Sequence, residues 1–143
     1  MSNDDSSEIP TPQGRRRRGL DGRVIAGRYE VTRTLAAGAN TLIADATDRQ
    51  LDRPVTIKLV RPELAESEEF RDAFVAEMET VAALSHPHLA AIYDWGTEQI
   101  GKRTTVYIVA EDLSGGSLRD LFDRGRMLTP SQALMVGLEA CRG

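Results

Sequence analysis

The stretch V-T-I-K-L-V at residues 55–60 decides the fold of this chain. It is short, rich in β-branched residues and preceded by Pro54, features that are typical of a buried strand. Lys58 carries a charge where this pattern predicts an apolar side chain. A lysine in such a strand is expected to point toward a polar partner, because burying an unpaired charge is costly.

Glu77 breaks a second local pattern in the same way. Residues at helical spacing form a stripe within about ±30° of one line at roughly 100° per residue: Phe70, Phe74, Glu77, Val81 and Leu84. Glu79 projects to the opposite, solvated side. An unpaired charge on a buried face costs several kcal/mol, so we predict that Lys58 and Glu77 pair where strand and helix pack together. In the alternative, Glu77 reaches water from the edge of the stripe and Lys58 ends at the rim of a sheet.

Composition narrows the class of protein. The 143 residues are 41% hydrophobic and 28% charged, as in a globular domain with a real core. No apolar stretch approaches the roughly 20 residues that span a bilayer, and the N-terminus is polar, so we expect a cytoplasmic protein. The single cysteine, Cys141, has no disulfide partner and is expected to pack in a helix. A net charge of −4 argues against a mainly electrostatic nucleic-acid binder.

The chain divides into a tail, a sheet-rich region and a helical end. Residues 1–22 offer little to bury and are predicted to be a disordered tail, with Arg15 to Arg18 interpreted as solvated rather than as a nucleic-acid or lipid contact. Strands are predicted at 28–37, 41–46, 55–60, 88–93 and 104–111, with turns around residues 38–40 and near Gly96 and Gly101. A helix is predicted from about Glu68 to Leu84, after a helical region that starts at Pro62.

Capping patterns predict two further helices. Ser117 is placed to cap a short helix that ends near Phe122. Thr129, Pro130 and Gln132 form a capping box with proline in the first turn, so a last helix is expected over residues 130–143. Its apolar side has no obvious partner in the chain, which suggests that a second domain starts here.

Several motifs in order resemble the N-terminal lobe of bacterial, actinobacterial-type, eukaryotic-like serine/threonine protein kinases over about residues 23–143. They are G-R-Y-E-V at 27–31, L-A-A-G-A-N-T-L-I-A-D-A-T-D at 35–48, V-T-I-K at 55–58, Glu77 in its helix, L-S-H-P-H-L at 84–89 and V-Y-I-V-A-E-D-L-S-G-G-S-L-R-D at 106–120. The resemblance implies an α+β fold: a five-stranded antiparallel sheet with one helix C, followed by the first helices of a truncated helical C-lobe. It places the ATP-binding N-lobe at residues 23–111, and the hinge and the start of the C-lobe at residues 112–143.

The resemblance also assigns roles to residues. Lys58 matches the lysine that holds the phosphates of ATP, and Glu77 matches the helix glutamate that orients it. The other nucleotide-binding residues that it implies are Leu35, Gly38 in the glycine-rich loop at residues 36–41, Ile43 over the adenine, Thr56 on the lysine strand, Ala110 as a small gatekeeper, and the backbone of Glu111 and Leu113 at the adenine edge. ATP with Mg²⁺ is the implied cofactor, and proteins are the implied substrates.

The chain departs from the family pattern at two places in the site. Of the three loop glycines only Gly38 remains, with Ala36 and Thr41 in the other positions. Glycines there let backbone N–H groups approach phosphate oxygens without a Cβ in the way, so this approach is compromised. Thr56 replaces the usual alanine and adds a hydroxyl and a branch to the pocket. His86 and His88 lack neighbouring acids or cysteines and are interpreted as structural, not as metal ligands.

The family's catalytic loop, H-R-D-x-x-x-x-N, and its metal-binding D-F-G motif are not among the 143 residues, so this chain alone is predicted to be inactive, with the magnesium ligands expected outside it. Three functions stay open. In the first, the chain is the ATP lobe of a serine/threonine kinase, and the complete protein can carry a later membrane segment. In the second, the chain is a pseudokinase module with a binding or regulatory role. In the third, it is an unrelated α+β domain that binds nucleic acid through Arg15 to Arg18.

Overall fold

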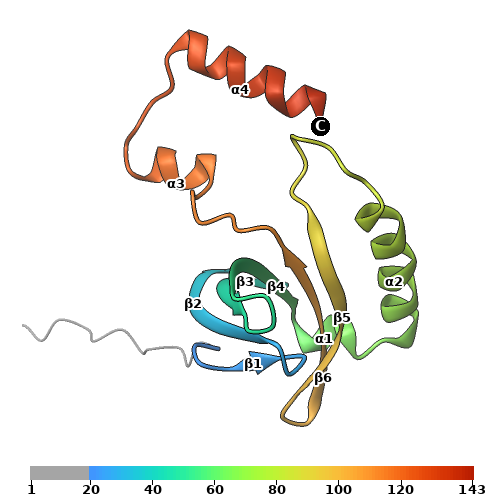
Figure 1. The fold of residues 1–143 in the computed structure, drawn as a ribbon. Helices are drawn as coiled ribbons and strands as arrows, with labels where there is room; N and C mark the ends of the chain where they lie inside the picture. The colour runs from blue at the N-terminus through green and yellow to red at the C-terminus, as the bar shows by residue number, and fades with distance from the viewer. Residues whose placement is uncertain (1–19) are drawn as a thin grey trace, which may run out of the picture.

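A computed structural model describes residues 20–143 and shows one antiparallel sheet with helices at one side and beyond one end (Figure 1). The sheet has six strands in the order β1-β2-β3-β4-β6-β5. Their bounds are β1 Val24–Ile25, β2 Tyr29–Ala37, β3 Thr41–Asp48, β4 Arg53–Val60, β5 Ile92–Ile100 and β6 Arg103–Ala110. The predicted stretch at residues 55–60 therefore lies in β4, between β3 and β6 in the sheet.

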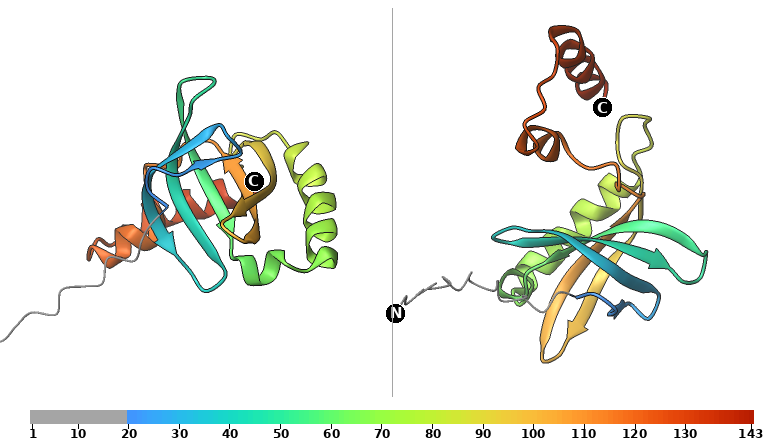
Figure 2. Two further views of the ribbon diagram at one scale, coloured as in Figure 1. Left: turned by 90° about the horizontal axis from the view of Figure 1, so that it is seen from below. Right: turned by 90° about the vertical axis from the view of Figure 1, so that its left-hand side faces the viewer.

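The strand register separates two faces of the sheet. Residues directly opposite each other on paired strands share a face, and the next pair points the other way. Ile43 opposes Lys58, which in turn opposes Ile108, whereas Leu42 opposes Leu59. The sheet is curved (Figure 2), and the apolar side chains of the main core lie on the face that carries Leu59. They are Ile25, Tyr29, Val31, Ala44, Ala46, Val55, Ile57, Leu59, Tyr107 and Val109.

Two helices lie beside the sheet and form a second, smaller core with it. They are α1 (Pro62–Ala65) and α2 (Glu68–Ala82), and α2 runs alongside β5 (Figure 1). Ser67 begins α2 as its N-cap, because its hydroxyl accepts a hydrogen bond from the amide of Phe70. The buried side chains of this second core are Val60, Ala65, Phe74, Met78 and Val106. Burial of this apolar surface holds α2 against the β5 side of the sheet.

The last two helices lie apart from the sheet, beyond an extended connection that leaves β6 (Figure 2). They are α3 (Leu118–Asp123) and α4 (Pro130–Arg142). Both begin with complete capping boxes: Ser117 with Asp120, and Thr129 with Gln132. The predicted caps at Ser117 and Thr129 are confirmed. Leu134, Met135 and Leu138 of α4 are exposed, as expected for a helix whose apolar side lacks a partner among the described residues.

The structure corrects several predicted boundaries. The sheet has six strands rather than five, because Val24 and Ile25 form a short strand against β2. The strand predicted at residues 88–93 begins only at Ile92 and runs through Gly96, so the single turn of this hairpin lies at Gly101, whose φ of +70° favours glycine. In α2, the helix ends at Ala82 rather than Leu84.

The start of the folded region also differs from the prediction of a tail over residues 1–22. Gly22 donates a backbone hydrogen bond to Val31, and Asp21 accepts bonds from the amide and hydroxyl of Thr34. Leu20 packs at the margin of the main core. Residues 20–22 are therefore part of the fold, and the remaining tail prediction, with Arg15 to Arg18, lies outside the described residues. Within residues 20–143, no helix has the length and apolar character that crossing a membrane requires.

Candidate nucleotide site

The face of the sheet that carries Lys58 bears a cavity of about 240 Å³. Its lining is formed by Ile43, Thr56, Lys58, Ala90, Ile92, Ile108, Ala110 and Leu113. The register explains this convergence, because Ile43, Lys58 and Ile108 oppose one another across three strands and Thr56 opposes Ala110. The predicted residues Ile43, Thr56, Lys58, Ala110 and Leu113 therefore meet at one cavity.

The other predicted site residues do not line this cavity. Leu35 is exposed on β2, and Gly38 lies in the turn between β2 and β3. This turn is tied to the end of the lysine strand, because the Arg61 guanidinium donates to the Gly38 carbonyl oxygen at 2.9 Å and the Arg61 amide donates to Asn40 at 2.8 Å. Glu111 follows β6, and its amide donates to the Ala91 carbonyl oxygen at 2.9 Å.

A second long-range hydrogen bond holds the segment after β6 against the sheet. The Leu113 amide donates to Oγ1 of Thr56 at 2.9 Å. The Asp112 carboxylate then accepts from the amide and the hydroxyl of Ser114, which shapes the following turn. Sequence analysis identified the extra hydroxyl of Thr56 but not its partner, since nothing local connects a strand residue to an amide 57 positions away.

Lys58 and Glu77 do not form the predicted pair in this structure. Both residues are exposed, and within residues 20–143 neither takes part in an ion pair. The predicted stripe of α2 was wrong at Glu77 and at Leu84, which is 55% exposed. Phe74 and Met78 are the buried residues of the helix, with Phe70 and Val81 partly buried. Including Met78 rotates the centre of the stripe away from Glu77, which leaves the glutamate at its solvated edge.

The buried charge of the sheet belongs instead to Asp48, which sequence analysis did not single out. Asp48 is fully buried at the end of β3 and accepts two hydrogen bonds from the Arg28 guanidinium, both 2.7 Å long. The amides of Gln50 and Leu51 also donate to it. The Arg28 hydrogen bonds are the main cause that lowers the pKa of Asp48 from 3.8 to about 2. An aspartate just before a turn, followed by two residues whose amides it can accept from, was the available signal.

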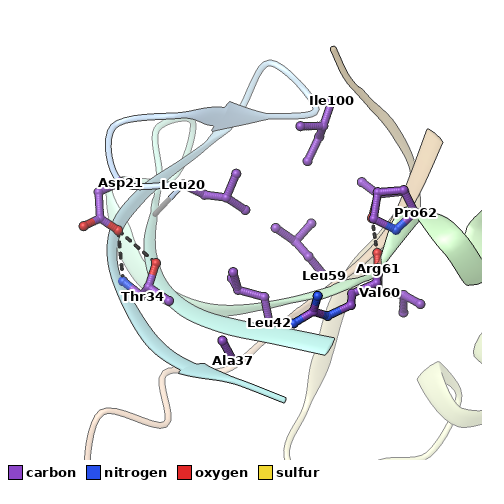
Figure 3. Close-up of a pocket in the computed structure, with 11 residues that line it drawn as sticks. Leu20, Asp21, Thr34, Ala37, Leu42, Leu59, Val60, Arg61, Pro62 and Ile100 are labelled. Atoms are coloured by element: carbon purple, nitrogen blue, oxygen red, sulfur yellow. Dashed lines mark hydrogen bonds between the residues drawn. The ribbon is translucent and has the colours of Figure 1, made fainter. Parts of the chain in front are cut away.

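A larger cavity of about 590 Å³ lies on the opposite face, at the margin of the main core (Figure 3). Leu42 and Leu59 line it, and these two residues oppose each other in the register that alternates with Ile43 and Lys58. Asp21, already bonded to Thr34, and Arg61 are its charged residues. None of the residues predicted to bind the nucleotide lines this cavity. It is therefore not the predicted nucleotide site, although it is larger than the cavity at Lys58.

The two histidines lie at the loop that follows α2, with ring centroids 5.2 Å apart. Nε2 of His88 lies 2.9 Å from a carboxylate oxygen of Glu139 in α4, so this loop contacts the last helix. Within the described part of the chain, no group of three or more histidine, cysteine or acidic residues is placed to hold a metal ion.

Comparisons with known proteins identify the family to which this fold belongs. A family model described as protein tyrosine and serine/threonine kinase matches residues 29–143. A probable serine/threonine-protein kinase of Streptomyces coelicolor is 37% identical over 112 residues, which are 78% of this chain and 17% of that protein. The serine/threonine-protein kinase PknA of Mycobacterium tuberculosis is 34% identical over 114 residues, 79% of this chain and 26% of that protein.

A solved structure agrees with these sequence relatives. The kinase domain of PknI from Mycobacterium tuberculosis, in a mutant form with one cysteine replaced by alanine, matches with a TM-score of 0.63 and 27% identity, over 77% of this chain and 43% of that one. The chain therefore spans only a fraction of each of these relatives. It belongs to the protein kinase family, as the N-terminal region of an actinobacterial-type serine/threonine kinase domain.

Proposed function

We propose that the complete protein transfers a phosphoryl group from ATP to serine or threonine residues of proteins, and that this chain supplies the lobe that binds ATP. The observation that carries the proposal is the convergence of Ile43, Thr56, Lys58, Ala110 and Leu113 on one cavity. In this cavity the apolar side chains form a slot for a flat base, and the ammonium group of Lys58 lies beside it for phosphate. The relatives are named as kinases, which favours this function over a pseudokinase.

The residues present fit an adenine nucleotide. The cavity of about 240 Å³ is below the roughly 300–1,000 Å³ of pockets that enclose drug-sized ligands, which suits a purine base better than a whole nucleotide. Ile43 and Ile108 offer apolar contact to the base, while Lys58 is free of ion pairs within residues 20–143. Mg²⁺, when bound with ATP, neutralises phosphate charge, and its ligands are expected in the catalytic region of the family.

We assign two roles to charged residues in the complete protein. Lys58 holds the phosphates by charge and hydrogen bonding, which positions the reacting phosphoryl group. Glu77 orients Lys58 once α2 is turned or shifted so that its carboxylate meets the ammonium. The exposed position of Glu77 in this chain is compatible with such a movement, because the side chain has no other ion-pair partner in residues 20–143.

Replacement of Lys58 in the complete protein tests the function. We expect Lys58→Met to reduce phosphorylation of a generic protein substrate by labelled ATP at least about 100-fold, since one electrostatic contact to the reacting group is lost. Lys102→Met is the matched control, because Lys102 is the only other lysine of the chain and is exposed in the turn between β5 and β6. Equal phosphorylation by wild type and Lys58→Met would exclude the assigned role of Lys58.

A further inference from the structure

We infer that the Thr56 hydroxyl occupies the hinge donor that an adenine ring would use, so that Thr56 lowers the affinity of this site for adenine nucleotides. The inference rests on the proposed function, because it concerns how ATP enters the same cavity. Thr56 acts as a specificity-determining residue through its contact with Leu113. The resemblance to kinases implies that the backbone of Leu113 binds the edge of the adenine ring.

The contact is between two groups that line the cavity. Oγ1 of Thr56 accepts a hydrogen bond of 2.9 Å from the Leu113 amide. Thr56 is 4% exposed and lies directly opposite Ala110 in the pairing of β4 with β6. It is two residues before Lys58 on the same strand and therefore on the same face. The hydroxyl thus lies between the gatekeeper position and the hinge, where the base is expected.

The two possible partners of the Leu113 amide exclude each other. A backbone amide has one hydrogen, which makes one strong hydrogen bond, and a purine ring nitrogen needs the same hydrogen. A buried threonine hydroxyl that lost this bond would be left without its partner, which has a free-energy cost of its own. A nucleotide that uses the Leu113 amide must therefore break an existing bond. An alanine at position 56 has no hydroxyl and imposes no such competition.

The local structure favours the blocked arrangement before any nucleotide binds. Asp112 accepts from both the amide and the hydroxyl of Ser114, at 3.0 Å and 2.8 Å, and so closes a turn just after Leu113. The Glu111 amide is bonded to Ala91 on the other side of Leu113. The segment is held from both sides with the Leu113 amide directed at β4. The donor is consequently occupied without rearrangement of the hinge.

The first experiment measures nucleotide affinity of the complete protein by calorimetric titration with ATP. Thr56→Val keeps the branch and nearly the volume but removes the acceptor, so we expect it to bind ATP about two- to tenfold more tightly than wild type. Thr56→Ser keeps an acceptor and is expected to bind more weakly than Thr56→Val. With 1-deaza-ATP, whose hinge-facing ring nitrogen is replaced by carbon, the advantage of Thr56→Val over wild type is expected to vanish.

Opposite results would overturn the inference in distinct ways. If Thr56→Val bound ATP no more tightly than wild type while Thr56→Ala did, the branch and not the hydrogen bond would limit binding. If Thr56→Val bound more weakly, the hydroxyl would be a direct contact to the nucleotide. In both cases wild type still binds ATP and the proposed function stands. If wild type, Thr56→Val and Thr56→Ala all failed to bind ATP, the proposed function and this inference would fall together.

A second measurement tests the hydrogen bond without any nucleotide. In ¹⁵N-labelled protein, we expect the Leu113 amide proton of wild type to exchange slowly with solvent and that of Thr56→Val to exchange at least about tenfold faster. The Glu111 amide, which is bonded to Ala91, is the internal control and should keep its protection in both proteins. Equal exchange at Leu113 in the two proteins would show that Thr56 does not hold this amide.

Discussion

Asp48 and Lys58 are both charged residues within apolar strands of the same sheet, yet they differ in burial and in ion pairing. Asp48 is fully buried, bonded to Arg28 through both carboxylate oxygens and supported by two backbone amides. Lys58 is exposed at a cavity and has no ion-pair partner within residues 20–143. The first charge stabilises the fold, whereas the second is available to a ligand.

The difference shows what a charge in an apolar pattern requires. A charge that is buried needs nearby partners in good geometry, because desolvation otherwise exceeds the electrostatic gain. A charge that stays at a cavity keeps its hydration and needs no partner in the free protein. Structural and functional charges in this lobe can therefore be separated by what their removal does to stability.

Removal of the Asp48 carboxylate should have the largest effect on the fold. We expect Asp48→Asn to lower the free energy of unfolding of the chain by about 3 kcal/mol, because the asparagine cannot neutralise Arg28. Urea denaturation followed by circular dichroism measures this. Glu30→Gln is the control, since the Arg49–Glu30 ion pair is largely exposed and is expected to contribute less than about 1 kcal/mol. Equal losses in the two variants would remove the distinction between Asp48 and surface charges.

Acid should weaken the fold through the same carboxylate. The pKa of Asp48 is lowered from 3.8 to about 2 in the folded chain, chiefly by the hydrogen bonds from Arg28. A lowered folded-state pKa gives stability that is complete above the unfolded pKa and is lost as the pH falls through the folded pKa. The stability difference between wild type and Asp48→Asn should thus be constant above about pH 5 and shrink between about pH 4 and pH 2. A difference that did not depend on pH would mean that ionised Asp48 is not its source.

Truncation of a buried side chain of α2 should have the next largest effect on the free energy of unfolding. Met78 is 6% exposed and lies in the smaller core, so Met78→Ala should lower the free energy of unfolding by about 2 kcal/mol. Val75→Ala on the same helix is the control, because Val75 is 40% exposed and its truncation should cost less than about 1 kcal/mol. A larger loss for Val75→Ala would mean that α2 packs through a different face in solution.

The smallest stability effects are expected at the residues assigned to function. Glu77→Gln should change the free energy of unfolding of this chain by less than about 0.5 kcal/mol, since Glu77 is exposed and has no ion-pair partner among the described residues. In the complete protein the same change should lower the rate of phosphoryl transfer about tenfold or more, through loss of the Lys58 contact. Glu79→Gln, on the solvated side of α2, should alter neither. Unchanged turnover in Glu77→Gln would exclude Glu77 as the residue that orients Lys58.

The resemblance to kinases assigned Lys58, Thr56 and Ile43 to one site, and strand alternation explains why the structure brings them together. Lys58, Thr56 and Ile43 fall on one face because side chains alternate along a strand and because short turns set the register of neighbouring strands. The caps at Ser117 and Thr129 were predictable for a similar reason, since each acts on an amide three residues away. The succession of strands and helices along the chain followed from the same short-range signals, apart from the two-residue strand at Val24 and Ile25.

The orientation of α2 was not predictable in this way. Two stripes compete on this helix, one through Glu77 and Leu84 and one through Met78, and they differ only in rotation about the helix axis. The contact with β5 and α1 selects the second stripe, because it buries Met78 where the first would bury a carboxylate. A few tens of degrees in the phase of a helix thus decide whether Glu77 faces the sheet or water.

By itself the sequence determined most of the strands, the helix caps and the face on which Lys58 lies, because backbone geometry imposes these periodicities over a few residues. Only the tertiary structure decided which polar groups are partners: Asp48 with Arg28, 20 positions apart, and Thr56 with Leu113, 57 positions apart. Such partners meet only when strands and loops pack, and packing depends on the burial of the whole apolar core rather than on local propensity.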